Sequence, residues 1–273
     1  MKVHHLNCGT MRPFGGKLVD GRGSVFRRAE LVCHCLLLET EHDGLVLVDS
    51  GLGVDDVRRP AETLSRGWRR MSQPVLDERE TAVRRVEALG FRADDVRHVV
   101  LTHLDLDHGG GLRDFPHAEV HVLQEELTNA LQPDKRGNDA VRYPDKQWSH
   151  GPKWVTHEPR GEAWFGFEGV REFREDVLLV PLFGHTRGHT GVAVKKDDGW
   201  LLHAGDAYFH HREMSDDPYC TPALTMMQNR VEQVRELRLH NQDRLRELKR
   251  THGIDIVNAH DATELRRHQL QPV

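Results

Sequence analysis

Apolar residues occur in short runs along this 273-residue chain, and polar turns separate the runs. Residues 35–40 (CLLLET) and 44–51 (GLVLVDSG) are two such runs joined by the turn EHDG, which predicts a β-hairpin. Residues 78–91 instead place their apolar side chains on one face at helical spacing, with Gly90 after the last turn. The early part of the chain is therefore predicted to combine a hairpin with an amphipathic helix.

Runs of both kinds continue to the C-terminus. Further strands are predicted at residues 96–102, 118–123, 175–182, 191–196, 200–206 and 254–260, and further helices at 124–131, about 222–251 and from Asp261. The order of strands, helix and strand occurs twice, with no linker between the two parts. We therefore predict one mixed domain, residues 1–273, in which two similar halves pack sheet against sheet with helices outside.

Residues 132–169 lack clear periodicity and contain Pro, Gly, Trp and charged residues. We predict a long insertion made of loops with a strand at 153–157, which is either a functional lid or a packed excursion. Its aromatic side chains either line an apolar pocket or form a small core of their own: Trp148, Trp154, Trp164, Phe165 and Phe167.

Composition and charge exclude several classes of protein. The hydrophobic fraction of 37% is sufficient for a core, and the net charge of −5 is spread along the chain. That distribution offers no basic surface for nucleic acid, and no apolar run approaches the roughly 20 residues needed to cross a bilayer. His4 and His5 stand where a secretory signal would be apolar, and the four cysteines have no disulfide or zinc-knuckle spacing. We therefore expect a cytoplasmic protein with buried, reduced thiols and no nucleic-acid or membrane partner.

Histidine is unusually frequent, at 20 residues, and several histidines stand beside carboxylates just after a predicted strand. The side chains in this position are His103, Asp105, Asp107, His108, His185, Asp206 and His260. Such groups cannot be left unpaired in an apolar interior, and strand ends are where α/β sheets usually build their sites. Imidazole and carboxylate together suit Zn²⁺, Mn²⁺ or Fe²⁺, so the pattern predicts a metal site.

Five segments of the chain resemble the ordered signatures of the metallo-β-lactamase-fold hydrolases: LVDSG (47–51), THLDLDHGG (102–110), GHTRGHT (184–190), GDAYF (205–209) and NAHD (258–261). Within that superfamily, CLLLET…LVLVDSG and the overall spacing are most similar to the N-acyl-homoserine-lactone lactonase group. The resemblance covers residues 30–262. It implies an α+β fold, a four-layer αβ/βα sandwich, with a dinuclear metal site that activates a water for hydrolysis.

The resemblance also implies the role of individual residues. The implied ligands are His103, Asp105 and His185 for one ion, Asp107, His108 and His260 for the other, and Asp206 as the bridge. Asp49 is similar to the buried aspartate that supports the site by hydrogen bonding, whereas His189 is not a ligand in the family pattern.

Two residues are expected to act in catalysis. Asp107 occupies the position of a carboxylate that binds metal and also shuttles a proton to the leaving oxygen. Tyr208 is expected to donate a hydrogen bond to the developing oxyanion. The comparable tyrosine of the lactonases stands one residue later, at the position of Phe209, so the alternative for Tyr208 is a wall residue.

Asp105 departs from the family pattern, which has a histidine at this position. A carboxylate is still a metal ligand, so we predict that ligation is retained. The alternative is that Asp105 misses the metal and leaves one weak site. The extra negative charge makes the centre less positive and favours harder ions. We expect two divalent ions, with Zn²⁺ first and Mn²⁺ or Fe²⁺ as alternatives.

The predicted function is metal-dependent hydrolysis of an ester or lactone bond in a small molecule. The alternatives are a thioesterase similar to glyoxalase II, a phosphodiesterase of the same fold, and a metal-binding protein that has lost catalysis. A nuclease would need a basic surface, and a redox member would need a flavin domain for which this length has no room.

Overall fold

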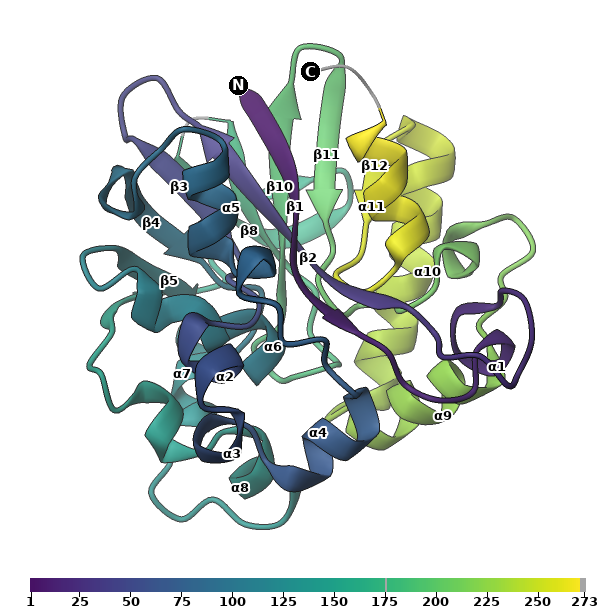
Figure 1. The fold of residues 1–273 in the computed structure, drawn as a ribbon. Coiled ribbons are helices and arrows are strands. Elements are labelled where there is room, and N and C mark those ends of the chain that lie inside the picture. Colours follow the sequence, from purple (N-terminus) through teal and green to yellow (C-terminus); the bar gives the residue numbers. More distant parts are fainter. Residues whose placement is uncertain (175, 271–273) are drawn as a thin grey trace.

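Two six-stranded sheets form the centre of the computed structural model, which describes residues 1–174 and 176–270 (Figure 1). The first sheet contains, in spatial order, β1 (Lys2–Met11), β2 (Leu31–Glu39), β3 (Leu45–Val48), β4 (Val96–Val100), β5 (Glu119–Leu123) and β6 (Lys153–His157). The second contains β12 (Asp255–Val257), β11 (Gly199–His203), β10 (Thr190–Lys196), β9 (Val177–Pro181), β8 (Phe167–Arg174) and β7 (Glu162–Trp164).

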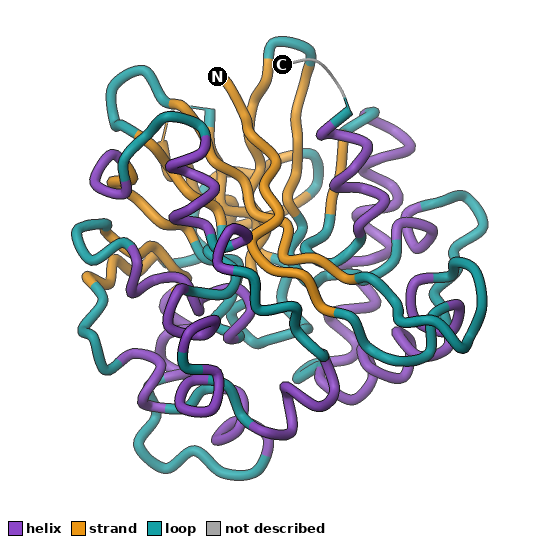
Figure 2. Tube along the Cα trace, viewed as in Figure 1, coloured by secondary structure: helices purple, strands orange, loops and turns teal. Residues whose placement is uncertain are grey.

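Helices cover the outside of the strands, as Figure 2 shows. The α-helices are α1 (Lys17–Asp20), α2 (Val54–Arg58), α3 (Pro60–Thr63), α4 (Arg66–Ser72), α5 (Ala82–Ala88), α6 (Leu106–Gly109), α7 (Gln124–Ala130), α8 (Asn138–Arg142), α9 (Pro222–Val231), α10 (Arg235–His252) and α11 (Ala262–Gln269). Short 3₁₀ helices are η1 (Glu78–Glu80), η2 (Ala93–Asp95), η3 (Gly110–Asp114), η4 (Asp145–Trp148) and η5 (His211–Met214). The predicted four-layer αβ/βα sandwich of the α+β class is confirmed.

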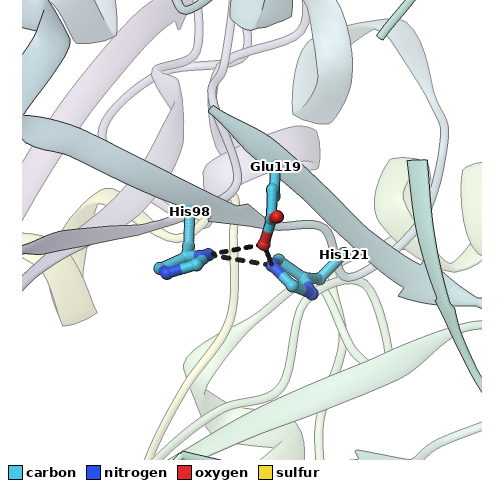
Figure 3. A group of neighbouring side chains, drawn as sticks. All are labelled: His98, Glu119 and His121. Carbon is cyan, nitrogen blue, oxygen red and sulfur yellow. Dashed lines mark hydrogen bonds and ion pairs between the residues drawn. The ribbon is translucent and has the colours of Figure 1, made fainter. Parts of the chain in front are cut away.

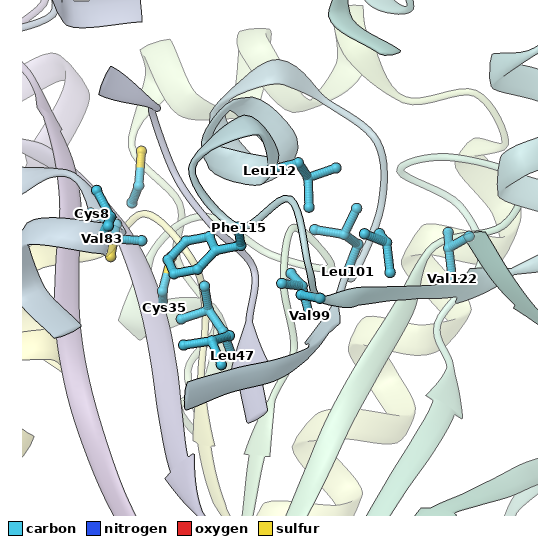
Figure 4. Close-up of a cluster of buried hydrophobic side chains, with 14 of the residues drawn as sticks. Cys8, Cys35, Leu47, Val83, Val99, Leu101, Leu112, Phe115 and Val122 are labelled. Carbon is cyan, nitrogen blue, oxygen red and sulfur yellow. The ribbon is translucent and has the colours of Figure 1, made fainter. Parts of the chain in front are cut away.

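Strand β2 shows why the central runs are apolar throughout. Its alternate residues Leu36 and Leu38 face the core between the sheets, while Cys35 and Leu37 face the core under the helices. A strand buried on both faces has no polar side, so its sequence does not alternate. The helix-side core of the first sheet also contains Phe115, which lies beside Cys35 and Leu47 in Figure 4.

Most predicted elements are present. The hairpin pairs β2 with β3 in antiparallel fashion, and α5 (Ala82–Ala88) lies within the segment 78–91 that is predicted to be helical. Strand β6 confirms the strand expected at 153–157, and α11 begins directly after Asp261, whose side chain caps it. All four cysteines are free. No helix in the described ranges is both long and apolar enough to cross a membrane.

The predicted insertion at 132–169 needs correction. Strand β6 completes the first sheet, and β7 and the start of β8 form the edge of the second, so much of this segment belongs to the sandwich itself. Four of its five aromatic residues divide between two cores: Trp148 and Trp154 pack with the first sheet, and Trp164 and Phe167 with the second, while Phe165 is exposed. They therefore form no separate core of the segment.

Candidate metal centre

Seven predicted ligands meet at one end of the two sheets, because each follows the end of a strand. The segment after β4 supplies His103, Asp105, Asp107 and His108, and the segments after β9, β11 and β12 supply His185, Asp206 and His260. Gly205 has a φ of +52°, and a Cβ there would lie 2.6 Å from His189 Nε2. Glycine is thus required for the turn that presents Asp206.

The side chains predicted as the first ligand set, His103, Asp105 and His185, lie together. Asp105 Oδ2 lies 3.4 Å from His103 Nε2 and 3.2 Å from His185 Nε2. Asp206 Oδ2 completes the set at 3.4 Å from His185 Nε2 and 3.8 Å from His103 Nε2.

The second set contains Asp107, His108 and His260. The other oxygen of Asp206, Oδ1, lies 3.4 Å from His108 Nε2 and 3.1 Å from His260 Nε2. Asp107 Oδ2 is 3.8 Å from His260 Nε2. Asp206 Oδ2 also lies 3.3 Å from His260 Nε2, so the Asp206 carboxylate lies between the two sets and contacts imidazoles of both.

These residues fit two divalent ions. Ligands about 2.0–2.2 Å from a tetrahedral ion lie about 3.3–3.5 Å from one another, close to most of the spacings in both sets. Within the described residues, His103 Nε2, His108 Nε2 and Asp206 Oδ1 are buried and have no hydrogen-bond partner. Buried polar atoms without partners are unfavourable, so a ligand for these three atoms is expected.

The opposite ring nitrogens are fixed by the protein. Nδ1 of His108 contacts Asp49 Oδ2 at 2.8 Å, and Nδ1 of His260 donates to the Val32 carbonyl at 2.8 Å. Asp49 also accepts from the backbone N–H and the hydroxyl of Thr102, both at 2.8 Å. Such partners orient each ring so that Nε2 is available to a metal.

His189 is held differently. Its Nδ1 donates to the Leu182 carbonyl, and its Nε2 accepts from the backbone N–H of Asp206, both at 2.9 Å. Both ring nitrogens are therefore used, and His189 positions the bridging residue instead of ligating, in line with the expectation.

Charge in the centre is organised around the carboxylates. Burial opposes protonation of His108, but Asp206 and Asp49 raise its pKa well above the usual value. Burial also opposes protonation of His260, yet Asp206 and Asp107 raise its pKa to about 9. The carboxylates thus favour the protonated, positively charged forms of His108 and His260. A divalent ion bound by these imidazoles would replace the protons and supply the same sign of charge.

Asp105 has a cationic partner that its sequence position did not reveal. The Nε of Arg142, at the end of α8, lies 2.7 Å from Asp105 Oδ1, while Oδ2 faces the ligand set. The Arg142 side chain is only 11% exposed. Its charge offsets the extra charge of Asp105, so the centre has the same total charge as one with histidine at 105.

Glu126 is a second residue that sequence reasoning missed. This buried carboxylate accepts from the Leu104 N–H at 2.9 Å, the Tyr143 hydroxyl at 3.1 Å and the Thr186 hydroxyl at 2.6 Å. It also accepts from the N–H of Gly188, where a Cβ would lie 2.2 Å from Glu126 N. Glu126 therefore joins the loop of His103 and Asp105 to the loop of His185.

Tyr208 does not lie where the prediction places it. Its side chain is fully buried, and its hydroxyl lies 3.0 and 3.1 Å from the two carboxylate oxygens of Glu264, to which it can donate. A hydroxyl held there is not directed at the ligand set, so Tyr208 is not placed to donate to an oxyanion at that centre. Phe209 instead faces the centre, with its ring 5.9 Å from that of His185 and 5.5 Å from that of His260.

Comparisons with protein families, sequences and solved structures all match proteins of one kind. The family model described as the metallo-beta-lactamase superfamily matches residues 28–247. A probable metallo-hydrolase of Mycobacterium tuberculosis is 44% identical over 96% of this chain and 80% of its own, and an N-acyl homoserine lactonase AttM of Rhizobium johnstonii is 28% identical over 96% and 93%. A crystal structure of a Bacillus thuringiensis AiiA mutant with N-decanoyl-L-homoserine at the active site superposes with a TM-score of 0.70 at 21% identity, covering 100% of this chain and 96% of that one.

Glu126→Gln is expected to lower both the stability and the metal affinity of the protein. The side-chain amide of glutamine would direct an N–H donor at groups that themselves donate. A buried donor without an acceptor lowers the free energy of unfolding by about 1–3 kcal/mol. Denaturant unfolding and zinc competition with a chelator would measure the two effects. Glu125→Gln, on the exposed side of the same helix, is the matched control and should change neither. Equal behaviour of the two variants would show that Glu126 does not hold the loops.

Asp105 and Arg142 are expected to act as a unit. Asp105→Ala should weaken the set of His103 and His185 and leave the second set loaded. Asp105→His should bind zinc poorly by itself, because it leaves the Arg142 charge unpaired beside the ions, and Arg142→Met should restore affinity in the double variant. Zinc competition binding across this double-mutant cycle measures the coupling. Strictly additive effects would contradict the pairing.

Proposed function

The chain belongs to the metallo-beta-lactamase superfamily, and from that membership we propose that it hydrolyses the ester or lactone bond of a small molecule with two divalent ions, Zn²⁺ first. The observation that carries the proposal is the position of Asp206, whose carboxylate lies 3.4 Å from His185 of one set and 3.1 Å from His260 of the other. Lactonases among the relatives favour a lactone as the bond.

Zinc ions held there would supply a Lewis acid for the carbonyl oxygen and an activated water as nucleophile. Asp107 is proposed to move a proton to the leaving oxygen. Burial raises the pKa of its carboxyl group, and its side chain remains 14% exposed at the edge of the second set.

Phe209 supports a substrate with an apolar part near the ions. The Phe209 ring forms an apolar wall beside His185 and His260 and offers no hydroxyl to an oxyanion.

The metal that we propose follows from Arg142. Asp105 alone would lower the positive charge of the centre and favour Mn²⁺ or Fe²⁺, but Arg142 at 2.7 Å restores that charge. With the charge restored, four imidazoles among the ligands favour zinc over harder ions.

The test is a substrate panel with and without metal. We expect hydrolysis of acyl lactones and simple esters by zinc-loaded protein, loss of activity on treatment with a chelator, and recovery when zinc is returned. Elemental analysis should find two zinc equivalents in this centre. Faster turnover of thioesters or phosphodiesters than of every lactone and ester would replace the proposed substrate, and chelator-resistant hydrolysis would end the proposal.

Asp206→Asn should reduce activity more than Asp49→Asn. Asp206 faces both ligand sets, whereas Asp49 acts through His108, and loss of such outer partners typically costs about 10–100-fold. Turnover and zinc content would be compared at matched folding, monitored by circular dichroism. Similar losses in both variants would mean that Asp206 is not the bridge.

A further inference from the structure

A second cluster of imidazole and carboxylate groups lies in the first sheet, toward the strand ends that are opposite the metal centre. Figure 3 shows His98 from β4 with Glu119 and His121 from β5. His98 Nδ1 lies 3.0 Å from His121 Nε2. Glu119 Oε2 lies 3.4 Å from His98 Nδ1 and 3.7 Å from His121 Nε2.

These three atoms have the spacing of ligands around one ion. Their separations bracket the roughly 3.3–3.5 Å expected between ligands of a tetrahedral zinc ion. Two imidazoles with one carboxylate are also a common protein donor set for zinc, with a fourth position left to water. We propose that His98, Glu119 and His121 form a third divalent-cation site, selective for zinc-like ions.

His157, on the neighbouring strand β6, supports the geometry. Its Nε2 lies 3.0 Å from His121 Nδ1, so His121 can donate there and present the lone pair of Nε2 to an ion. In this tautomer, His98 Nδ1 can donate its proton to His121 Nε2 at 3.0 Å, and a cation would take the place of that proton between the two imidazoles and the carboxylate.

Phe173 fixes the planes of these rings. Its ring packs edge-on against three imidazoles, at 4.6 Å from His121, 5.9 Å from His98 and 6.0 Å from His157. The donors are therefore held in place before an ion arrives, which reduces the ordering cost of binding.

The charges around the cluster act in both directions. Burial lowers the pKa of His121 to about 3, so its ring is a neutral donor at physiological pH. Within the described part of the chain, Glu119 has no ion-pair partner other than His98 and His121, and its half-exposed carboxylate is available to a cation. Arg174 opposes a cation, because its positive charge lowers the pKa of His98 and His121, and its pairing with Asp43 at 3.1 Å offsets part of that charge.

An ion at this point would connect two parallel strands near the edge of the first sheet. His98 lies on β4, and the other two ligands lie on β5, next to the edge strand β6. The expected role is therefore structural, and it does not rest on the hydrolytic activity proposed for the main centre.

The test is to load the full chain with Zn²⁺ alone, remove the excess, and count zinc by elemental analysis while thermal unfolding is recorded. Glu119→Gln and His121→Leu should each hold one zinc equivalent fewer than wild type and lose part of the zinc-dependent rise in Tm. His117→Leu, which removes an exposed histidine near the same strand, is the matched control and should match wild type. Asp206→Asn should keep the zinc that the Glu119 variant loses.

Two results would overturn the proposal. One is an equal zinc count in wild type, Glu119→Gln and His121→Leu, and the other is an equal loss in the His117→Leu control. Glu119→Gln alters only a half-exposed side chain, so it decides the question even if His121→Leu fails to fold. Because the readout is the difference in zinc count, failure of the main centre to hydrolyse any substrate leaves the test intact.

Discussion

The burial of Asp206 and the partial burial of Asp105 and Asp107 beside four imidazoles are the constraint on which the rest of the structure depends. Charged groups removed from water are strongly destabilising unless each has a partner. Here the partners are arranged in pairs: Asp206 faces imidazoles through both oxygens, and Asp105 faces His185 on one side and Arg142 on the other. Full compensation requires positive charge between the sheets, and the ligand spacing provides room for two divalent ions.

Polar side chains outside the ligand set hold the ligand loops in position. Glu126 accepts hydrogen bonds from two ligand loops at once, and Asp49 connects Thr102 with His108. The segment after α7 takes part as well, since Arg142 and Tyr143 reach Asp105 and Glu126. The segment 132–169, which lacks periodicity in the sequence, thus supplies the positive charge that balances Asp105.

The sequence alone predicts that the seven proposed ligands converge, because each follows an apolar strand within a few residues and the strand ends of a sandwich lie together. His103 follows β4, and His260 follows β12, so local order determines their position. Arg142 and Glu126 could not be predicted, because their partners are far away along the chain. Tyr208 shows the same limit: its place after Asp206 was evident, but its hydroxyl turns to Glu264, a contact that only the packing of α11 creates.

Histidine count does not separate ligands from structural residues, but the use of the two ring nitrogens does. In His108, Asp49 occupies Nδ1 while the buried Nε2 is left without a partner among the described residues, so a lone pair is available to a metal. In His189, both nitrogens have protein partners, so no lone pair remains. His121 differs from both, because each of its ring nitrogens lies 3.0 Å from another imidazole, that of His157 or that of His98. The use of the ring nitrogens therefore excludes His189 as a ligand of the main centre, whereas the His98 and His121 pair is distinguished from ordinary packed histidines by the Glu119 carboxylate beside it.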